Sequence, residues 1–400
     1  MVLLDQVVFS GNSFITTLLL TRILDLSNFG IYASVILFIH LVISMLNAII
    51  MQPLQVTISS IKDKKSYVSF SFFLLIVSVI AISILLFIAL KLNIPFFKSY
   101  NNLTIELLAL TFGIVTHDYF RKLFLAKIQV KKAFILDFIV ATLHISILTI
   151  ALLNFEISLS QTLLYLGLGY IPAILLGILF IKPKLITKTI TKDYLKSHYH
   201  QSKWLLMTAI VQWWSSNLFV VASGVFLGLK MLGVFRFVQS LFGVLNILLQ
   251  TFENYLLPQT SKLLIKSRNQ AKKYIRATSI KTAIPFGGIL AILFVFSKPI
   301  IVLAGGEEYA PYDYVVKGMA ILYFFIFIGY PIRMAIRVLI LNKNFFIGYL
   351  ISFAFSMLSF NYILEKWQLT GVILGLAISQ ILVISYWFYI LQKNNFSLWK

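Results

Sequence analysis

The chain has 400 residues, of which 60% are hydrophobic and 12% are charged, and its formal net charge is +21. This composition excludes a soluble globular protein and predicts an all-α, polytopic membrane protein. No polar connection is long enough to form a separate soluble domain. Cysteine is absent, which excludes a disulfide framework, a thiolate nucleophile and a thiolate metal site.

Apolar runs of about 20 residues, the length that crosses a bilayer as a helix, occur twelve times along the chain. They predict spans near 2–24, 30–51, 67–90, 103–125, 130–153, 159–181, 204–228, 231–257, 279–304, 314–341, 345–364 and 369–392. The first run starts at Val2 with no basic segment before it, so a cleavable signal peptide is not expected. The polar residues at the end of the fourth run are predicted to emerge at the surface: His117, Asp118, Arg121 and Lys122.

Lysine and arginine fall mainly on one side of the predicted membrane. With a cytoplasmic N-terminus, the inner connections hold 26 of the 34 basic residues, and the outer connections hold seven. Basic loops remain in the cytoplasm, so this asymmetry predicts that both termini are cytoplasmic. It also explains the net charge, because the inner loops meet anionic lipid headgroups, and nucleic-acid binding is not expected.

The longest polar connection, 182–203, divides the chain into two lobes of six spans, 1–181 and 204–400. Its mixture of Lys, Thr, Tyr and His predicts a basic cytoplasmic linker, either a surface segment or an interfacial helix. His198 and His200 in this linker are expected to be solvated, because no carboxylate or third histidine stands at metal-ligand spacing. No metal and no cofactor are predicted.

The two lobes resemble each other weakly. A shift of 203 residues places Gly30 over Gly233 and Asn47 over Gln250. A repeat in parallel orientation implies two lobes about an axis along the membrane normal, with a central cavity between them. Chance similarity among apolar helices is the alternative.

The eighth run carries a polar seam. Six residues recur at steps of three and four: Arg236, Gln239, Gly243, Asn246, Gln250 and Glu253. This spacing places them on one face of a helix. Lipid does not accept such a face, because an arginine near the bilayer centre costs about 3 kcal/mol on insertion scales. The seam therefore faces a solute in a cavity, or it faces neighbouring helices through interhelical hydrogen bonds.

Other spans add polar candidates for the same cavity. They are Asn12 and Arg22 in the first span and His40 and Asn47 in the second. A guanidinium presents a fork of donors that matches phosphate oxygens, so Arg22 and Arg236 favour an anionic solute. For Arg22, the alternative is snorkelling at the membrane interface.

Charged residues inside the remaining spans are few. Arg333 and Arg337 are four residues apart in the tenth span, where they either meet a phosphate from the cytoplasm or act as positive-inside anchors. Three intramembrane carboxylates are candidates for coupling to a proton or sodium ion, with pairing to a neighbouring cation as the alternative: Asp5, Asp137 and Glu253. No catalytic motif is present, so an enzyme is not expected.

Loose motifs along nearly the whole chain carry a family resemblance. They lie at 5–14, 21–24, 29–32, 257–258, 297–300, 306–309 and 369–377. These segments resemble Wzx-type O-antigen and polysaccharide-repeat flippases of the multidrug/oligosaccharidyl-lipid/polysaccharide (MOP) superfamily. Members of this family usually begin with a basic tail before the first span, and this chain enters at Val2, which leaves the placement of Asp5 open.

The resemblance implies a flippase of the bacterial inner membrane that serves O-antigen, lipopolysaccharide or other surface polysaccharide biosynthesis. It would move an undecaprenyl-diphosphate-linked oligosaccharide from the cytoplasmic to the periplasmic leaflet by alternating access. The resemblance carries over only Arg22 and Arg236, as cavity cations. In our interpretation of the polar seam as the lining of a flippase cavity, Gln239, Asn246 and Gln250 would contact sugars. The alternatives are an ion-coupled multidrug exporter of the same architecture and a membrane-embedded polymerase or ligase.

Overall fold

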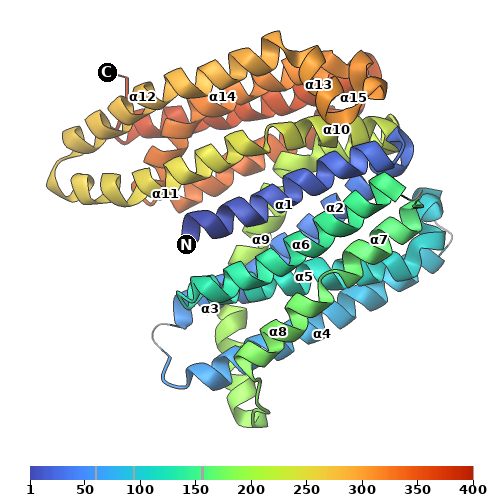
Figure 1. Cartoon of the computed structure of the whole chain (residues 1–400). Helices are drawn as coiled ribbons and strands as arrows, with labels where there is room; N and C mark the ends of the chain where they lie inside the picture. Colours follow the sequence, from blue (N-terminus) through green and yellow to red (C-terminus); the bar gives the residue numbers. More distant parts are fainter. Residues whose placement is uncertain (59–60, 93–94, 155–156, 400) are drawn as a thin grey trace. The chain divides into compact units, whose positions relative to one another are not determined.

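The computed structural model describes residues 1–58, 61–92, 95–154 and 157–399, which are almost wholly helical (Figure 1). Contacts between residues divide the chain into two units, Met1–Ile210 and Val211–Lys400. Within the described ranges, nine helices are long and apolar enough to cross a membrane, or ten when a bent pair counts as one span. The predicted all-α, multi-span class is therefore confirmed, and a total of twelve spans stays a prediction.

The first unit contains the helices up to the start of α9. They are α1 (Val2–Ile23), α2 (Leu26–Leu46) with a π-helical turn (Asn47–Met51), α3 (Gln52–Thr57), α4 (Lys64–Lys91), a 3-10 segment (Pro95–Leu103), α5 (Thr104–Ala126), α6 (Val130–Asn154), α7 (Leu159–Leu168), α8 (Ile171–Ile181) and the start of α9 (Lys188–Phe226), which continues into the second unit from Val211. Helix α1 packs on α6, and α5 packs on both α6 and α7. These contacts bring the polar residues of α1, α5 and α6 together.

The second unit contains the remaining helices. They are α10 (Leu229–Leu241), α11 (Gly243–Lys266), α12 (Arg268–Val295), α13 (Ser297–Gly305), α14 (Asp313–Val338) and α15 (Asn342–Lys393). Helix α14 packs on α11, α12 and α15 (Figure 1). Some of the polar residues of α11 therefore lie next to α14 in their own unit.

Helix α15 consists of two arms, in the places predicted for the last two spans. Gln368 breaks it with φ 46° and ψ −128°. The arms then pack against each other, with Ser356 Oγ 3.1 Å from Ser379 Oγ and Trp387 Nε1 donating to the Asn344 carbonyl at 3.1 Å.

Aspartates mark the starts of two spans. Asp25 accepts hydrogen bonds from the amides of Ser27 and Asn28 at 2.8 Å, which caps α2. Asp63 caps α4 by accepting from the Ser66 hydroxyl and amide, and these bonds, with Lys184 nearby, lower the pKa of Asp63 to about 2. Because the folded pKa lies below the ordinary value, the cap is retained at neutral pH and is lost only as the pH falls toward 2.

The predicted eighth span is not one straight helix. Helices α10 and α11 meet at 49°. At the junction, the Phe242 amide donates to the Gln239 carbonyl and the Leu245 amide donates to the Phe242 carbonyl, so i to i+3 bonds replace the α-helical pattern. The expectation that six residues share one continuous helical face is therefore wrong, because the face is interrupted next to Gly243.

The predicted linker is helical from Lys188 onward and runs on into the seventh predicted span as α9. The expectation that His198 is solvated is wrong, because its side chain is buried, whereas His200 is exposed. His198 Nδ1 donates to the Ile49 carbonyl at 3.3 Å, and Nε2 accepts from the Tyr67 hydroxyl at 2.6 Å. These bonds attach the start of α9 to the π-helical turn after α2 and to α4.

Replacing His198 with alanine is expected to destabilise the first unit. The change leaves the Tyr67 hydroxyl and the Ile49 carbonyl without this partner, which costs about 1–3 kcal/mol for each buried group. His200→Ala, two residues away and exposed, is the matched control. Thermal unfolding of both variants in detergent checks this, and equal midpoints would contradict it.

A second stability prediction concerns the packing of α15 on α9. A Cβ added at Gly375 would overlap the ring carbons of Phe219, which is fully buried. Gly375→Ala is therefore expected to cost about 1–3 kcal/mol through overpacking. At Gly287 an added Cβ meets nothing within 4 Å. Gly287→Ala should consequently leave the unfolding temperature unchanged or slightly higher. An unchanged unfolding temperature for Gly375→Ala would show that this contact is not tight.

Candidate functional site

A buried ionic cluster lies in the first unit, where α1, α5 and α6 meet. Arg121 Nε donates to Asp137 Oδ2 at 2.7 Å, and Nη2 donates to Asp5 Oδ2 at 2.9 Å and to Gln6 Oε1 at 3.2 Å. The Arg121 guanidinium also lies 3.9 Å from the ring centroid of Phe9. Two of the three carboxylates predicted for ion coupling, Asp5 and Asp137, thus converge on one arginine.

His117 completes this cluster. It lies one helical turn before Arg121, and its Nε2 is 3.2 Å from Asp137 Oδ1 without the alignment of a hydrogen bond. Three buried atoms have no hydrogen-bond partner among the described residues: Asp5 Oδ1, Asp137 Oδ1 and His117 Nε2. With a neutral imidazole, one guanidinium faces two carboxylates, so the cluster carries one excess negative charge.

The expectation that the polar residues at the end of α5 emerge at the surface is wrong. His117 and Arg121 are 4% and 7% exposed, and Asp118 and Lys122 are half-buried. His117 and Arg121 are buried because α1 and α6 supply Asp5 and Asp137, whose negative charges balance the positive charge of Arg121 in the absence of water. The spacing of His117 and Arg121 by four residues on an apolar helix is the signal that could have revealed this site.

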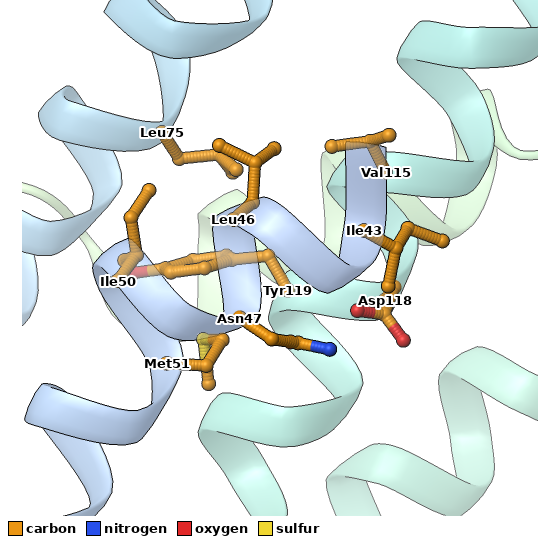
Figure 2. Close-up of a pocket in the computed structure, with 9 residues that line it drawn as sticks. All are labelled: Ile43, Leu46, Asn47, Ile50, Met51, Leu75, Val115, Asp118 and Tyr119. Atoms are coloured by element: carbon orange, nitrogen blue, oxygen red, sulfur yellow. The ribbon is translucent and has the colours of Figure 1, made fainter. Parts of the chain in front are cut away.

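A second polar group surrounds the π-helical turn at the end of α2. Lys122 Nζ donates to Asn47 Oδ1 at 2.9 Å and to Asp118 Oδ2 at 2.6 Å. Asn47 and Asp118 line a pocket of about 10 Å³, room for about one water molecule, with their polar atoms on the same side (Figure 2). Single π-helical turns inside α-helices occur frequently at functional sites. The side chain of Asn47 thus accepts a hydrogen bond from a lysine of α5 in such a turn.

The other candidates of the first unit occupy different positions. Asn12 is half-buried in α1 and accepts from Thr16 Oγ1 at 3.3 Å. Arg22 is exposed in the last turn of α1, and His40 is exposed on α2.

In the second unit, polar residues of α11 bond across to α14. Asn246 Nδ2 donates to the Tyr323 hydroxyl at 2.8 Å, and the Tyr330 hydroxyl donates to Glu253 Oε2 at 2.8 Å. Glu253 also forms an ion pair with Arg337. Glu253 is thus paired with a neighbouring cation, which is the alternative to ion coupling given for this carboxylate above.

The N-terminal part of the same polar seam lies on α10. Arg236 Nη1 donates to Gln239 Oε1 at 2.6 Å, and both side chains are half-buried. Asn246 and Gln250 are exposed, so the seam is partly bonded to α14 and partly open. The interhelical hydrogen bonds given as one interpretation are therefore present for part of the seam, and a solute-facing role for the open part stays a prediction.

Arg333 and Arg337 lie in different surroundings. The Arg333 guanidinium is 5.8 Å from the ring centroid of Tyr330 and 6.0 Å from that of Phe345. Its Nε is buried with no hydrogen-bond partner among the described residues. Arg337 is exposed and reaches Glu253.

Comparison with solved structures shows the class of fold. A lipid II flippase MurJ in an inward-closed conformation aligns with TM-score 0.74 and 14% identity over 98% of this chain and 88% of that chain. An inward-facing multidrug resistance MATE transporter of the MOP superfamily aligns with TM-score 0.73 and 13% identity over 97% and 94%. A MOP superfamily transporter from Pyrococcus furiosus aligns with TM-score 0.59 and 12% identity over 99% and 94%. The fold is that of MOP superfamily transporters, as the resemblance predicted.

The family follows from the sequence. A family model described as polysaccharide biosynthesis protein matches residues 19–313. The chain belongs to this polysaccharide biosynthesis protein family. No curated protein sequence matches the chain.

Proposed function

We propose that the protein is a flippase for undecaprenyl-diphosphate-linked oligosaccharides in the inner membrane of a bacterium. It moves the sugar repeat from the cytoplasmic to the periplasmic leaflet by alternating access, for O-antigen or another surface polysaccharide. Membership of the polysaccharide biosynthesis protein family and the fold shared with a lipid II flippase support this function. The basic inner connections support cytoplasmic termini.

The observation that carries the proposal is the partly open polar seam of α10 and α11. A membrane-spanning segment exposes amides here, at Asn246 and Gln250, near a half-buried arginine, Arg236. Polar groups persist in hydrocarbon only where protein or water receives them. In the proposed mechanism, Arg236 binds the diphosphate, with Arg22 as a second cation, and the amides contact sugars.

Other polar residues have supporting roles in this proposal. Asn12, His40 and Asn47 add hydrogen-bonding groups for sugars in the first unit. Arg333 and Arg337 meet the phosphate when it enters from the cytoplasm, and Arg337 would leave Glu253 to do so.

The ionic cluster of α1, α5 and α6 suggests a proton as the coupling ion. Its excess negative charge is costly when buried, and one proton on His117 or a carboxylate removes it. A sodium ion would need several oxygen ligands, and Arg121 already occupies one oxygen of Asp5 and one of Asp137. Glu253 is a weaker candidate because Arg337 and Tyr330 already bond it.

A multidrug exporter is the alternative with the same fold. An exporter of cationic drugs would be expected to present free carboxylates along its polar seam. Here the seam presents an arginine, amides and a carboxylate that is already paired with Arg337. This charge pattern favours an anionic solute.

Deleting the gene tests the proposed function in cells. Lipid-linked sugar repeats should accumulate on the cytoplasmic leaflet, as detected by a leaflet-specific probe, and a plasmid copy should restore surface polysaccharide. Accumulation on the periplasmic leaflet would instead point to a polymerase or ligase. Unchanged surface polysaccharide in the deletion strain would contradict the proposal.

A further inference from the structure

An apolar groove of about 520 Å³ runs along the first unit between α4, α5 and α8. Its lining extends along α4 from Phe72 to Phe87 and includes Phe112 of α5 and Ile178 of α8. Ser83 and Thr116 are the lining residues with polar side chains, and the rest are hydrocarbon. Neither the ionic cluster nor the polar seam uses this groove.

The groove opens on a surface that faces lipid. Helix α4 is a membrane span with few buried residues, and Val77, Ile84 and Leu85 are all more than half exposed. Water is absent at this depth, and an apolar surface gains nothing by excluding hydrocarbon. The occupant of the groove is therefore a hydrocarbon chain.

The length of the groove indicates which kind of chain. From Phe72 to Phe87, an α-helix rises about 22 Å at 1.5 Å per residue. One leaflet is half of the hydrocarbon core, about 15 Å. The acyl chain of an ordinary phospholipid stays within its own leaflet, so a longer chain fits this groove better.

The two ends of the groove differ in charge and closure. At one end, Lys91 places its Nζ 5.9 Å from the ring centroid of Phe87. At the other end, Ser71 and Tyr119 share a hydrogen bond of 2.7 Å, and the ring of Phe72 packs on Phe120. An anionic headgroup is therefore accommodated at the Lys91 end, where an ammonium group attracts phosphate.

We infer that this groove binds the polyprenyl chain of the lipid-linked substrate, and that Lys91 receives the phosphate after it has left Arg236 and Arg22. The inference rests on the proposed function and extends it with a site for the lipid tail. The lipid tail remains in hydrocarbon while the sugar crosses the membrane. The groove between α4, α5 and α8 would determine where the tail lies during this step.

The test uses full-length protein in lipid nanodiscs and a polyprenyl phosphate that carries a photoreactive diazirine on its chain. Ser83→Trp places an indole in the groove, and Leu85→Trp, on the exposed face of the same helix, is the matched control. Cross-links in the wild type and Leu85→Trp should map to α4 and α8. In Ser83→Trp, the apparent affinity should fall about tenfold. Ile84→Trp, at an exposed lining position, gives the same result if Ser83→Trp does not fold.

Competition experiments distinguish a polyprenyl chain from the acyl chains of an ordinary phospholipid as the occupant of the groove. Unlabelled polyprenyl phosphate should displace the probe, and phosphatidylglycerol, which is anionic but has ordinary acyl chains, should displace it poorly. Lys91→Gln should weaken labelling. Equal competition by phosphatidylglycerol, or labelling that both tryptophans in the groove leave unchanged, would overturn the inference. Because binding is measured on purified protein, its failure is distinguishable from a failure of flipping in the deletion strain.

Discussion

Arg121→Met is expected to lower the free energy of unfolding of the first unit by about 3–5 kcal/mol, the cost of leaving a buried charge unpaired. Arg121 is 7% exposed and bonds both Asp5 and Asp137, so its removal leaves two carboxylates facing each other without a cation. Thermal and denaturant unfolding in detergent measure this loss. We expect the variant to be purified in low yield or partly unfolded.

Compensating changes separate the charge effect from the loss of packing. The triple variant Arg121→Met, Asp5→Asn and Asp137→Asn should recover most of the stability, because no unpaired charge remains buried. Lys122→Met is the matched control, since Lys122 is the neighbouring cation and is half-buried. A triple variant as unstable as Arg121→Met would show that the guanidinium acts through packing on Phe9 instead.

The recovered triple variant also tests proton coupling. The folded triple variant has no excess negative charge in this cluster, so neither a carboxylate nor the buried His117 is driven to take up the proton that the proposal assigns there. Flipping by the triple variant should therefore lose its response to a pH gradient, whereas the wild type retains it. An unchanged response would exclude this cluster as the coupling site.

The second large effect is expected at Arg236. Arg236→Glu should reduce surface polysaccharide about ten- to hundredfold, because the charge-assisted hydrogen bonds to a phosphate are worth about 1.5–3 kcal/mol and the new carboxylate repels it. Arg236→Lys should retain part of the activity, because it keeps the charge but loses the fork of donors. Surface polysaccharide is measured by gel electrophoresis of cell extracts.

Arg276→Glu is the control for this charge reversal, since Arg276 is exposed on α12 of the same unit. It should leave surface polysaccharide close to the wild-type amount. Thermal unfolding must show that Arg236→Glu is folded. A folded Arg236→Glu protein with normal surface polysaccharide would exclude Arg236 as a phosphate-binding residue.

The class of protein could be predicted from the sequence, because hydrophobic runs of bilayer length need no tertiary information. The MOP fold was predicted from loose motifs, and the structural likeness confirms it. The bend between α10 and α11 could not be read from periodicity, since Gly243 is compatible with a straight apolar helix. It arises from local i to i+3 bonds around Phe242.

The buried clusters were harder to predict for a different reason. Polar and charged residues such as His117 and Arg121 are typical of the end of a membrane span. Their burial is energetically possible only because α1 and α6 bring Asp5 and Asp137 next to them. His198 similarly depends on Tyr67, which is 131 residues away in the sequence. The carboxylates Asp5 and Asp137 could be identified as unusual from the sequence, but their common partner could not.

Flipping in a purified system tests the central claim most directly. Proteoliposomes that contain this protein and a lipid-linked oligosaccharide are probed with a reagent that reaches only the outer leaflet. We expect the labelled fraction to rise with the wild-type protein and with Arg276→Glu, and to stay at the protein-free level with Arg236→Glu. Folded wild-type protein that leaves the labelled fraction at the protein-free level would contradict the account.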